Sequence, residues 1–177
     1  MFMVNSLYGG GAEKVLQTIL GNIDYTKYDV TLYSMHRESI SPEYYPESIH
    51  YKVVFDNYCG KYQIGKIIYQ IKAKIKGKCF QWLPSSLFYR LFFHEKFDVE
   101  IAFIEGESTK IISGSTNKKS KKIAWVHIDL VANPWTEFLY KSNNDERNHY
   151  MHFDNICCVS NKVKEAFLKK FGEVKYE

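Results

Sequence analysis

The sequence predicts an α/β fold with a mainly parallel sheet, and three observations support this prediction. A short apolar strand runs into a glycine-rich turn that opens directly into a helix. Runs rich in β-branched and aromatic residues then alternate with helical patterns along all 177 residues, 45% of which are hydrophobic. Polar residues follow several of these runs. Alternating strands and helices favour a parallel sheet covered by helices on both faces, and a chain of this length buries one core more readily than two.

The first third of the chain is predicted to form a β-α-β-β unit. Residues 2–4 form a short strand, and the helix after the turn begins near Ala12, because apolar residues recur there at intervals of three and four. Gly21 with Asn22 is expected to end this helix. The runs YDVTLYS and HYKVVF predict strands at residues 28–34 and 50–55.

The rest of the chain alternates predicted helices with strands. Helices are expected at residues 62–76, ended by Gly77, at 84–95, begun by Pro84, at 108–113, capped by Ser108, within 135–150, and at 161–171, capped by Ser160. Strands are expected at residues 99–104, 122–126 and 155–159. This order predicts a Rossmann-like three-layer sandwich with a mainly parallel sheet, in a single domain spanning residues 1–177.

Three consecutive glycines, Gly9, Gly10 and Gly11, lie between the first strand and the first helix. Glycines let the backbone approach a ligand closely, and the N–H groups of the first helical turn favour an anion. The turn therefore predicts contact with a phosphate or diphosphate. It matches neither the G-x-G-x-x-G pattern, because Glu13 and Lys14 occupy the last positions, nor a Walker loop. The alternative, a tight turn without a ligand, stays open.

Polar residues also lie just after the predicted strands, where ligands bind in parallel α/β sheets. Glu105 and Gly106 follow one strand, and His127 and Asp129 follow the next. Two of them have structural alternatives, since His127 can be a half-buried histidine with satisfied nitrogens and Glu105 a solvated acid in a turn. Ser160 is expected to cap a helix rather than to bind a ligand.

The net charge of +4 is small, but the lysines are unevenly distributed. No acidic residue occurs between residues 57 and 94, and lysines crowd the first half of this interval. The segment predicts an amphipathic helix that packs through its isoleucines and exposes its lysines. Alternatively, its lysines and a following tryptophan contact the inner face of a membrane. The residues expected in that contact are Lys61, Lys66, Lys72, Lys74, Lys76 and Trp82. No nucleic acid is expected, because the chain has no RNA-binding signature and its aromatics are spaced for helix packing.

Cysteine spacing and hydropathy favour a cytoplasmic protein without a metal. The four cysteines, Cys59, Cys79, Cys157 and Cys158, lack C-x-x-C spacing, and the adjacent pair is expected in the core. No signal peptide is expected before the first strand, and no apolar run reaches the ~18 residues that span a bilayer. We therefore expect a location in the cytoplasm or peripherally on the inner face of the cell membrane, and no cofactor.

Four motifs, in order along the chain, carry a resemblance to a known family. They are NSLYGGGAEKVL at residues 5–16, FDVEIAFIEGESTK at 97–110, KKIAWVHIDL at 121–130 and ICCVSNKVKEAFLKKFG at 156–172. With these motifs the chain resembles the N-terminal half of retaining glycosyltransferases of family 4, which have the two-domain GT-B fold. The resemblance is strongest to bacterial enzymes that build surface polysaccharide, and it covers the sheet-forming parts of the whole chain.

The resemblance implies roles for particular residues. In that family the N-terminal domain mainly holds the acceptor, and its glycine loop reaches toward the diphosphate of a nucleotide-sugar donor; the three glycines carry that loop here. His127 is expected to face the donor sugar and to orient a hydroxyl near the reacting carbon. Glu105, Gly106 and Asp129 lie where acceptor contacts are expected. No base role follows for them, because in this clan the departing phosphate often takes the acceptor proton.

The function implied is transfer of a hexose-type sugar, with retention, from a nucleotide-sugar donor to a glycan or lipid-linked acceptor in surface polysaccharide or lipopolysaccharide synthesis. The family's C-terminal nucleotide-sugar domain is absent from residues 1–177, so this polypeptide alone is expected to be inactive. The nucleotide sugar is a substrate, and no metal is expected. The alternative is a non-catalytic nucleotide- or phosphate-binding Rossmann-like module.

Overall fold

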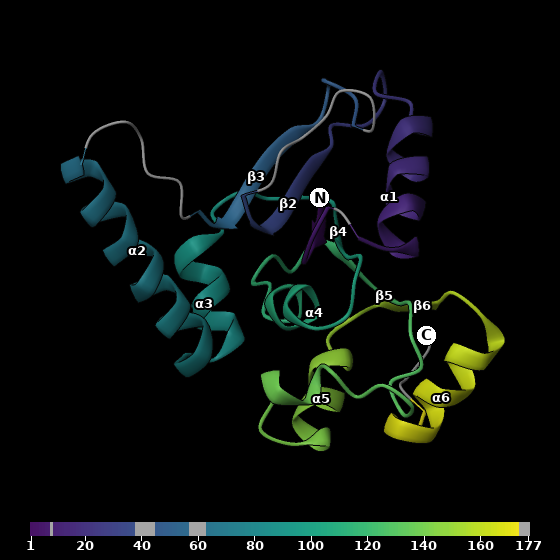
Figure 1. Cartoon of the computed structure of the whole chain (residues 1–177). Helices are drawn as coiled ribbons and strands as arrows, with labels where there is room; N and C mark the ends of the chain where they lie inside the picture. The colour runs from purple at the N-terminus through teal and green to yellow at the C-terminus, as the bar shows by residue number, and fades with distance from the viewer. Residues whose placement is uncertain (8, 38–44, 57–62, 174–177) are drawn as a thin grey trace. The chain divides into compact units, whose positions relative to one another are not determined.

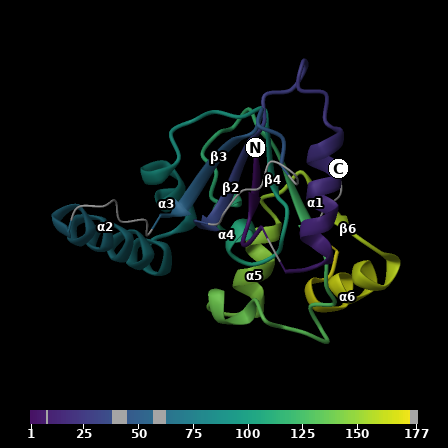
Figure 2. The same ribbon diagram turned by 45° about the horizontal axis from the view of Figure 1, so that its top comes forward.

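The computed structural model describes residues 1–7, 9–37, 45–56 and 63–173, without the side chains of residues 63–70. The chain divides into two compact units, Met1–Leu83 and Pro84–Glu177. Their helices and strands are drawn in Figure 1 and, turned by 45°, in Figure 2.

The first unit contains a three-stranded parallel sheet and two helices. Its elements are β1 (Phe2–Val4), α1 (Gly11–Asn22), β2 (Thr31–His36), β3 (His50–Phe55) and α2 (Gln63–Trp82). β2 lies between β1 and β3, with Phe2 opposite Leu32 and Thr31 opposite His50. The first five residues of β2 are all buried, as expected for a central strand. In both views α1 and α2 lie on opposite sides of β2 and β3 (Figures 1 and 2).

The second unit also contains a three-stranded parallel sheet, but with more helices. Its elements are α3 (Ser85–Phe92), β4 (Val99–Ala102), α4 (Glu107–Ile112), β5 (Lys121–Val126), the 3₁₀ turn η1 (Glu137–Leu139), α5 (Asn143–Tyr150), β6 (Asn155–Cys158) and α6 (Asn161–Phe171). β5 lies between β4 and β6, and both pairings are parallel. Aromatic side chains join α5 to α6, where the Tyr150 ring packs edge-on against Phe167 with centroids 4.9 Å apart.

The predicted fold class is confirmed. The chain is α/β and Rossmann-like, its strand pairings within each unit are all parallel, and helices flank the strands. None of the helices within the described ranges has the length and apolar character needed to cross a bilayer.

The predicted end of α2 at Gly77 is wrong, because the helix continues to Trp82. A glycine inside a helix costs only about 1 kcal/mol relative to alanine, which tertiary contacts readily offset. Here the ring of Phe80 packs edge-on against Phe55 of β3, with centroids 5.6 Å apart. This contact ties the turn after Gly77 to the sheet.

Other boundaries differ where a local hydrogen bond replaces the expected element. β2 begins at Thr31 rather than residue 28, because the Tyr28 N–H closes a turn on the Asp24 carbonyl. Ser108 does not cap α4; Gly106 does, while the Ser108 hydroxyl donates to the Ile104 carbonyl inside the unit. The predicted cap Ser160 is confirmed, since its hydroxyl accepts from the Val163 N–H.

The helical stretch expected within residues 135–150 is divided into η1 and α5. Ser142 separates them, because its extended backbone stops one element while its hydroxyl accepts from the Asp145 N–H and begins the next. Such an N-cap satisfies one of the N–H groups that a helix start leaves without an internal partner.

Candidate functional site

The carboxyl ends of β4 and β5 bring two predicted residues, Glu105 and His127, into direct contact. The strands are parallel with Ala102 opposite Ala124, so both chains leave the sheet at the same edge. Glu105 is only 1% exposed, and its Oε2 accepts a hydrogen bond from the His127 backbone N–H at 3.1 Å. The structure therefore excludes the interpretation of Glu105 as a solvated turn acid.

Burial governs the charge of Glu105. Loss of water contact raises the pKa of its carboxyl, and the hydrogen bond from His127 together with a side-chain bond from Trp135 opposes that rise only in part. Burying a carboxylate is costly, and buried carboxyl groups with a raised pKa commonly serve binding or positioning.

Gly106 fixes the turn that carries Glu105 into α4. Its φ of +96° lies in the region that strongly favours glycine, and an added Cβ would lie 2.6 Å from Cη2 of Trp135. The hydroxyl of Tyr140 donates to the Gly106 carbonyl at 3.2 Å. The glycine is thus required for packing under Trp135.

The His127 ring has a defined orientation. Its Nε2 lies 2.8 Å from the Phe103 carbonyl, and because a carbonyl only accepts, Nε2 carries the proton in this contact. In the neutral ring Nδ1 then holds the lone pair that accepts a hydrogen bond. The ring also stacks on Trp125, with centroids 5.7 Å apart, and lies 5.1 Å from the Phe103 ring.

Asp129 is engaged locally. Its Oδ1 accepts hydrogen bonds from the backbone N–H groups of Val131 at 3.0 Å and Ala132 at 2.9 Å. The Ala132 bond is the main reason that the pKa of this carboxyl is lowered. Asp129 therefore shapes the loop after β5.

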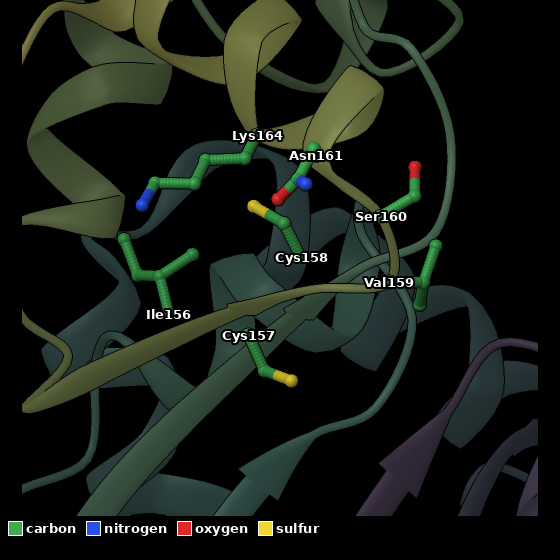
Figure 3. A pocket seen from close by; sticks show the side chains of 7 residues that line it. All are labelled: Ile156, Cys157, Cys158, Val159, Ser160, Asn161 and Lys164. Atoms are coloured by element: carbon green, nitrogen blue, oxygen red, sulfur yellow. The ribbon is translucent and has the colours of Figure 1, made fainter.

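A hollow of about 570 Å³ lies at the end of β6. It is lined by Ile156, Cys157, Cys158, Val159, Ser160, Asn161 and Lys164. Figure 3 shows the two thiols on opposite sides of the strand, with Cys158 toward Asn161 and Lys164. The expectation that both cysteines are core residues is wrong, because both are half-buried; burial still raises the pKa of each thiol.

The glycine turn belongs to the first unit. Gly9 has a φ of +126°, so a side chain there would be strained, and Gly10 is the extended residue before α1. A hollow of about 570 Å³ is lined by Leu7, Gly9, Gly10, Gly11, Glu13, Lys14 and Gln17. One carboxylate oxygen of Glu13 lies 2.8 Å from where a Cβ on Gly10 would be. This position puts a negative charge beside the turn, which opposes an anion there.

Two features of these sites escaped the sequence analysis. The first is the carboxylate of Glu13 beside the turn. The position of Glu13 in the sequence could have predicted it, because the third residue of a helix commonly reaches back to the helix N-terminus. The second is a polar cluster in which the Ser113 hydroxyl lies 2.6 Å from Nδ1 of His149 and the Lys110 ammonium donates to the Leu139 carbonyl at 2.6 Å. No spacing in the sequence joins Ser113 to His149.

The described residues contain no group of three or more histidine, cysteine or acidic side chains arranged to hold a metal ion. In comparisons with known proteins, no protein-family model matches the chain and no curated protein matches it.

Proposed function

We propose that this chain forms the acceptor-binding side of a retaining glycosyltransferase that moves a sugar from a nucleotide-sugar donor to a glycan or lipid-linked acceptor. The observation that carries the proposal is the Glu105–His127 pair at the carboxyl ends of β4 and β5. One residue is a buried carboxylate, and the other presents an oriented imidazole. This edge is where parallel α/β sheets bind their ligands.

His127 acts as a positioning group in this proposal. With Nε2 held by the Phe103 carbonyl, the Nδ1 lone pair accepts a hydrogen bond from a sugar hydroxyl. Glu105 fixes the backbone of His127 and is itself too buried to serve as an open base. The acceptor proton then leaves with the donor's phosphate, and the protein contributes mainly orientation.

The glycine turn supplies the phosphate contact of the proposal. The N–H groups at the start of α1 and its dipole favour a diphosphate, provided that the Glu13 carboxylate turns away. Lys14, which lines the same hollow, adds a positive charge. Asp129 remains a proposed acceptor contact through the loop that it organises.

The alternative, a non-catalytic module that binds a nucleotide or phosphate, rests on a different observation. The hollow at the glycine turn is lined entirely by residues of the first unit and needs neither Glu105 nor His127. Under this alternative His127 has no part in function, so substitutions at His127 separate the two proposals.

The test is complementation in the cell that encodes the chain. Deleting the gene should remove or shorten a surface glycan, and the unchanged gene should restore it. H127Q keeps a donor toward the Phe103 carbonyl but lacks the Nδ1 lone pair, so restoration should fall at least about tenfold at equal protein level. H152N, which alters an exposed histidine, is the matched control and should restore the glycan fully. An unaltered glycan profile after deletion would refute the proposal.

A further inference from the structure

Three large apolar side chains in the described part of helix α2 are exposed. Ile71 is 51% exposed, Ile75 is 56% exposed and Trp82 is 83% exposed. At 100° per residue these three positions and Lys78 fall within about 60° of one another around the helix axis. They form a single stripe along the solvent side, which we call the outer face of α2.

The opposite side of α2 holds the helix on the protein. Ala73, Lys76, Gly77 and Phe80 lie there, all half-buried, and Phe80 packs against Phe55 of β3. Burial also lowers the pKa of the Lys76 ammonium, as expected for a lysine on an inward side. The expectation that the isoleucines pack inward is therefore wrong for Ile71 and Ile75, which leave more than 50% of their surface in water.

Lysines lie within and beside the apolar stripe. Lys72, Lys74 and Lys78 are exposed, whereas Lys76 turns inward. Lys61 lies outside the described residues, and Lys66 lies in α2 with its side chain outside the description. Because no acidic residue occurs from 57 to 94, no carboxylate within this stretch of sequence offsets their charge.

We propose that the outer face of α2 docks the protein onto an anionic lipid surface, with the helix lying in the plane of the interface. A stripe of isoleucine and tryptophan suits the boundary between headgroups and acyl chains, and lysines beside it attract anionic headgroups. The net positive charge of this helix selects an anionic surface over a neutral one. This inference goes beyond the proposed function and does not depend on it.

Two contributions to membrane binding are expected from the outer face, one from charge and one from apolar burial. Each exposed lysine contributes about 1 kcal/mol, or about fivefold in partitioning, which salt screens. The isoleucines and Trp82 contribute through burial, which salt does not weaken. Binding should therefore be strong on anionic vesicles in low salt, weaker in high salt, and weakest on neutral vesicles.

The experiment is flotation of the intact chain with phosphatidylcholine vesicles that contain either no anionic lipid or about 30% phosphatidylglycerol. K74Q/K78Q should reduce the partition coefficient on anionic vesicles by about 25-fold and flatten its salt dependence. I71S/I75S should reduce the partition coefficient at every salt concentration. Its salt dependence should remain, because the lysines are unchanged. The matched controls are K118Q/K119Q in an exposed loop and F138S at an aromatic residue that is 75% exposed; both should bind as the unchanged chain does.

A second readout reports the depth of Trp82. Its fluorescence should shift to shorter wavelength on anionic vesicles and be quenched by brominated acyl chains, and W82F should lose most of this change. Equal flotation with both vesicle types, or the same loss in the control variants, would overturn the proposal. So would self-association of the lipid-free chain that I71S/I75S abolishes, because the outer face would then contact a second copy.

Discussion

Lys170 shows how a single buried charge is accommodated in the second unit. Its ammonium lies 3.2 Å from a carboxylate oxygen of Glu137 and 3.2 Å from one of Glu146, although the side chain is only 5% exposed. Glu146 also accepts a hydrogen bond from the Thr136 hydroxyl. Such a network makes little net contribution when complete, but removing one partner leaves an uncompensated buried charge.

The charge of His149 links folding to pH. Burial lowers its pKa from 6.5 to about 4, and the nearby Lys110 and His152 oppose protonation while Asp145 favours it. Because the unfolded chain binds a proton more readily, the stabilising contribution is present above pH 6.5 and is lost as pH falls toward 4.

We expect the free energy of unfolding to decrease by about 1 to 2 kcal/mol between about pH 7 and pH 5 on account of His149. In H149N this part of the decrease should be absent, because the amide does not titrate while it can still bond to Ser113. Urea unfolding at both pH values measures the difference. H94N, at an exposed histidine, should leave the decrease in place, and an unchanged pH slope in H149N would contradict the prediction.

The positions of Glu105 and His127 could be predicted from the sequence, but the burial of Glu105 could not. Their position after two adjacent strands predicted that they meet at one edge of the sheet, and the register of β4 and β5 accounts for it. The burial of Glu105 was not predictable, because Trp135 and Tyr140, which close over this turn, come from a later loop whose path the strand pattern does not specify.

At the scale of elements, helix α2 continues through Gly77, a residue type with low helix propensity. A Cβ added at Gly77 would meet nothing within 4 Å, and the same holds for Gly21 in α1. Neither residue has a positive φ. Both glycines therefore weaken their helices through backbone entropy alone.

We expect G77A to stabilise α2 by about 0.5 to 1 kcal/mol, and G21A to do the same for α1. Hydrogen exchange of the amides in each helix should slow by about two- to fivefold. G9A is the contrasting variant, because at a φ of +126° an alanine is strained and should destabilise the turn. Faster exchange of α2 amides in G77A would show that Gly77 is needed as a glycine.

Element boundaries were predicted well where a cap is encoded locally and poorly where packing decides. Ser160 caps α6 through its own hydroxyl, so the sequence contains the whole signal. Gly77 looked like a helix end because its intrinsic propensity is low, but the contact of Phe80 with Phe55 extends the helix. Ser108 looked like a cap, yet its hydroxyl bonds to a carbonyl one turn earlier.

At the scale of the whole molecule, the residues of the proposed function divide between the two units. The glycine turn lies in the first unit, and Glu105 and His127 lie in the second. Among its described residues, the turn offers a nucleotide backbone N–H groups, Lys14 and Gln17, while the Glu13 carboxylate opposes a negative charge. This is a weak phosphate site in the form that the structure describes.

Calorimetric titration of the intact chain with uridine or guanosine diphosphate should accordingly show no saturation at micromolar ligand, with a Kd of about 1 mM or weaker. E13Q should bind the diphosphate more tightly, because the variant removes the opposing charge at the start of α1. Inorganic sulfate is the control for unspecific anion binding. Saturation of the unchanged chain at micromolar nucleotide would favour the non-catalytic module over the glycosyltransferase.

The α/β class, the order of strands and helices, and the polar residues at the strand ends follow from the sequence alone, because periodicity and local caps are encoded within a few consecutive residues. Which face of a helix is exposed, and whether a carboxylate is buried, depend on segments distant in the sequence. Tertiary packing buried Glu105 beneath a later loop and left Ile71, Ile75 and Trp82 exposed, while Phe80 on the other side of the helix contacts the sheet.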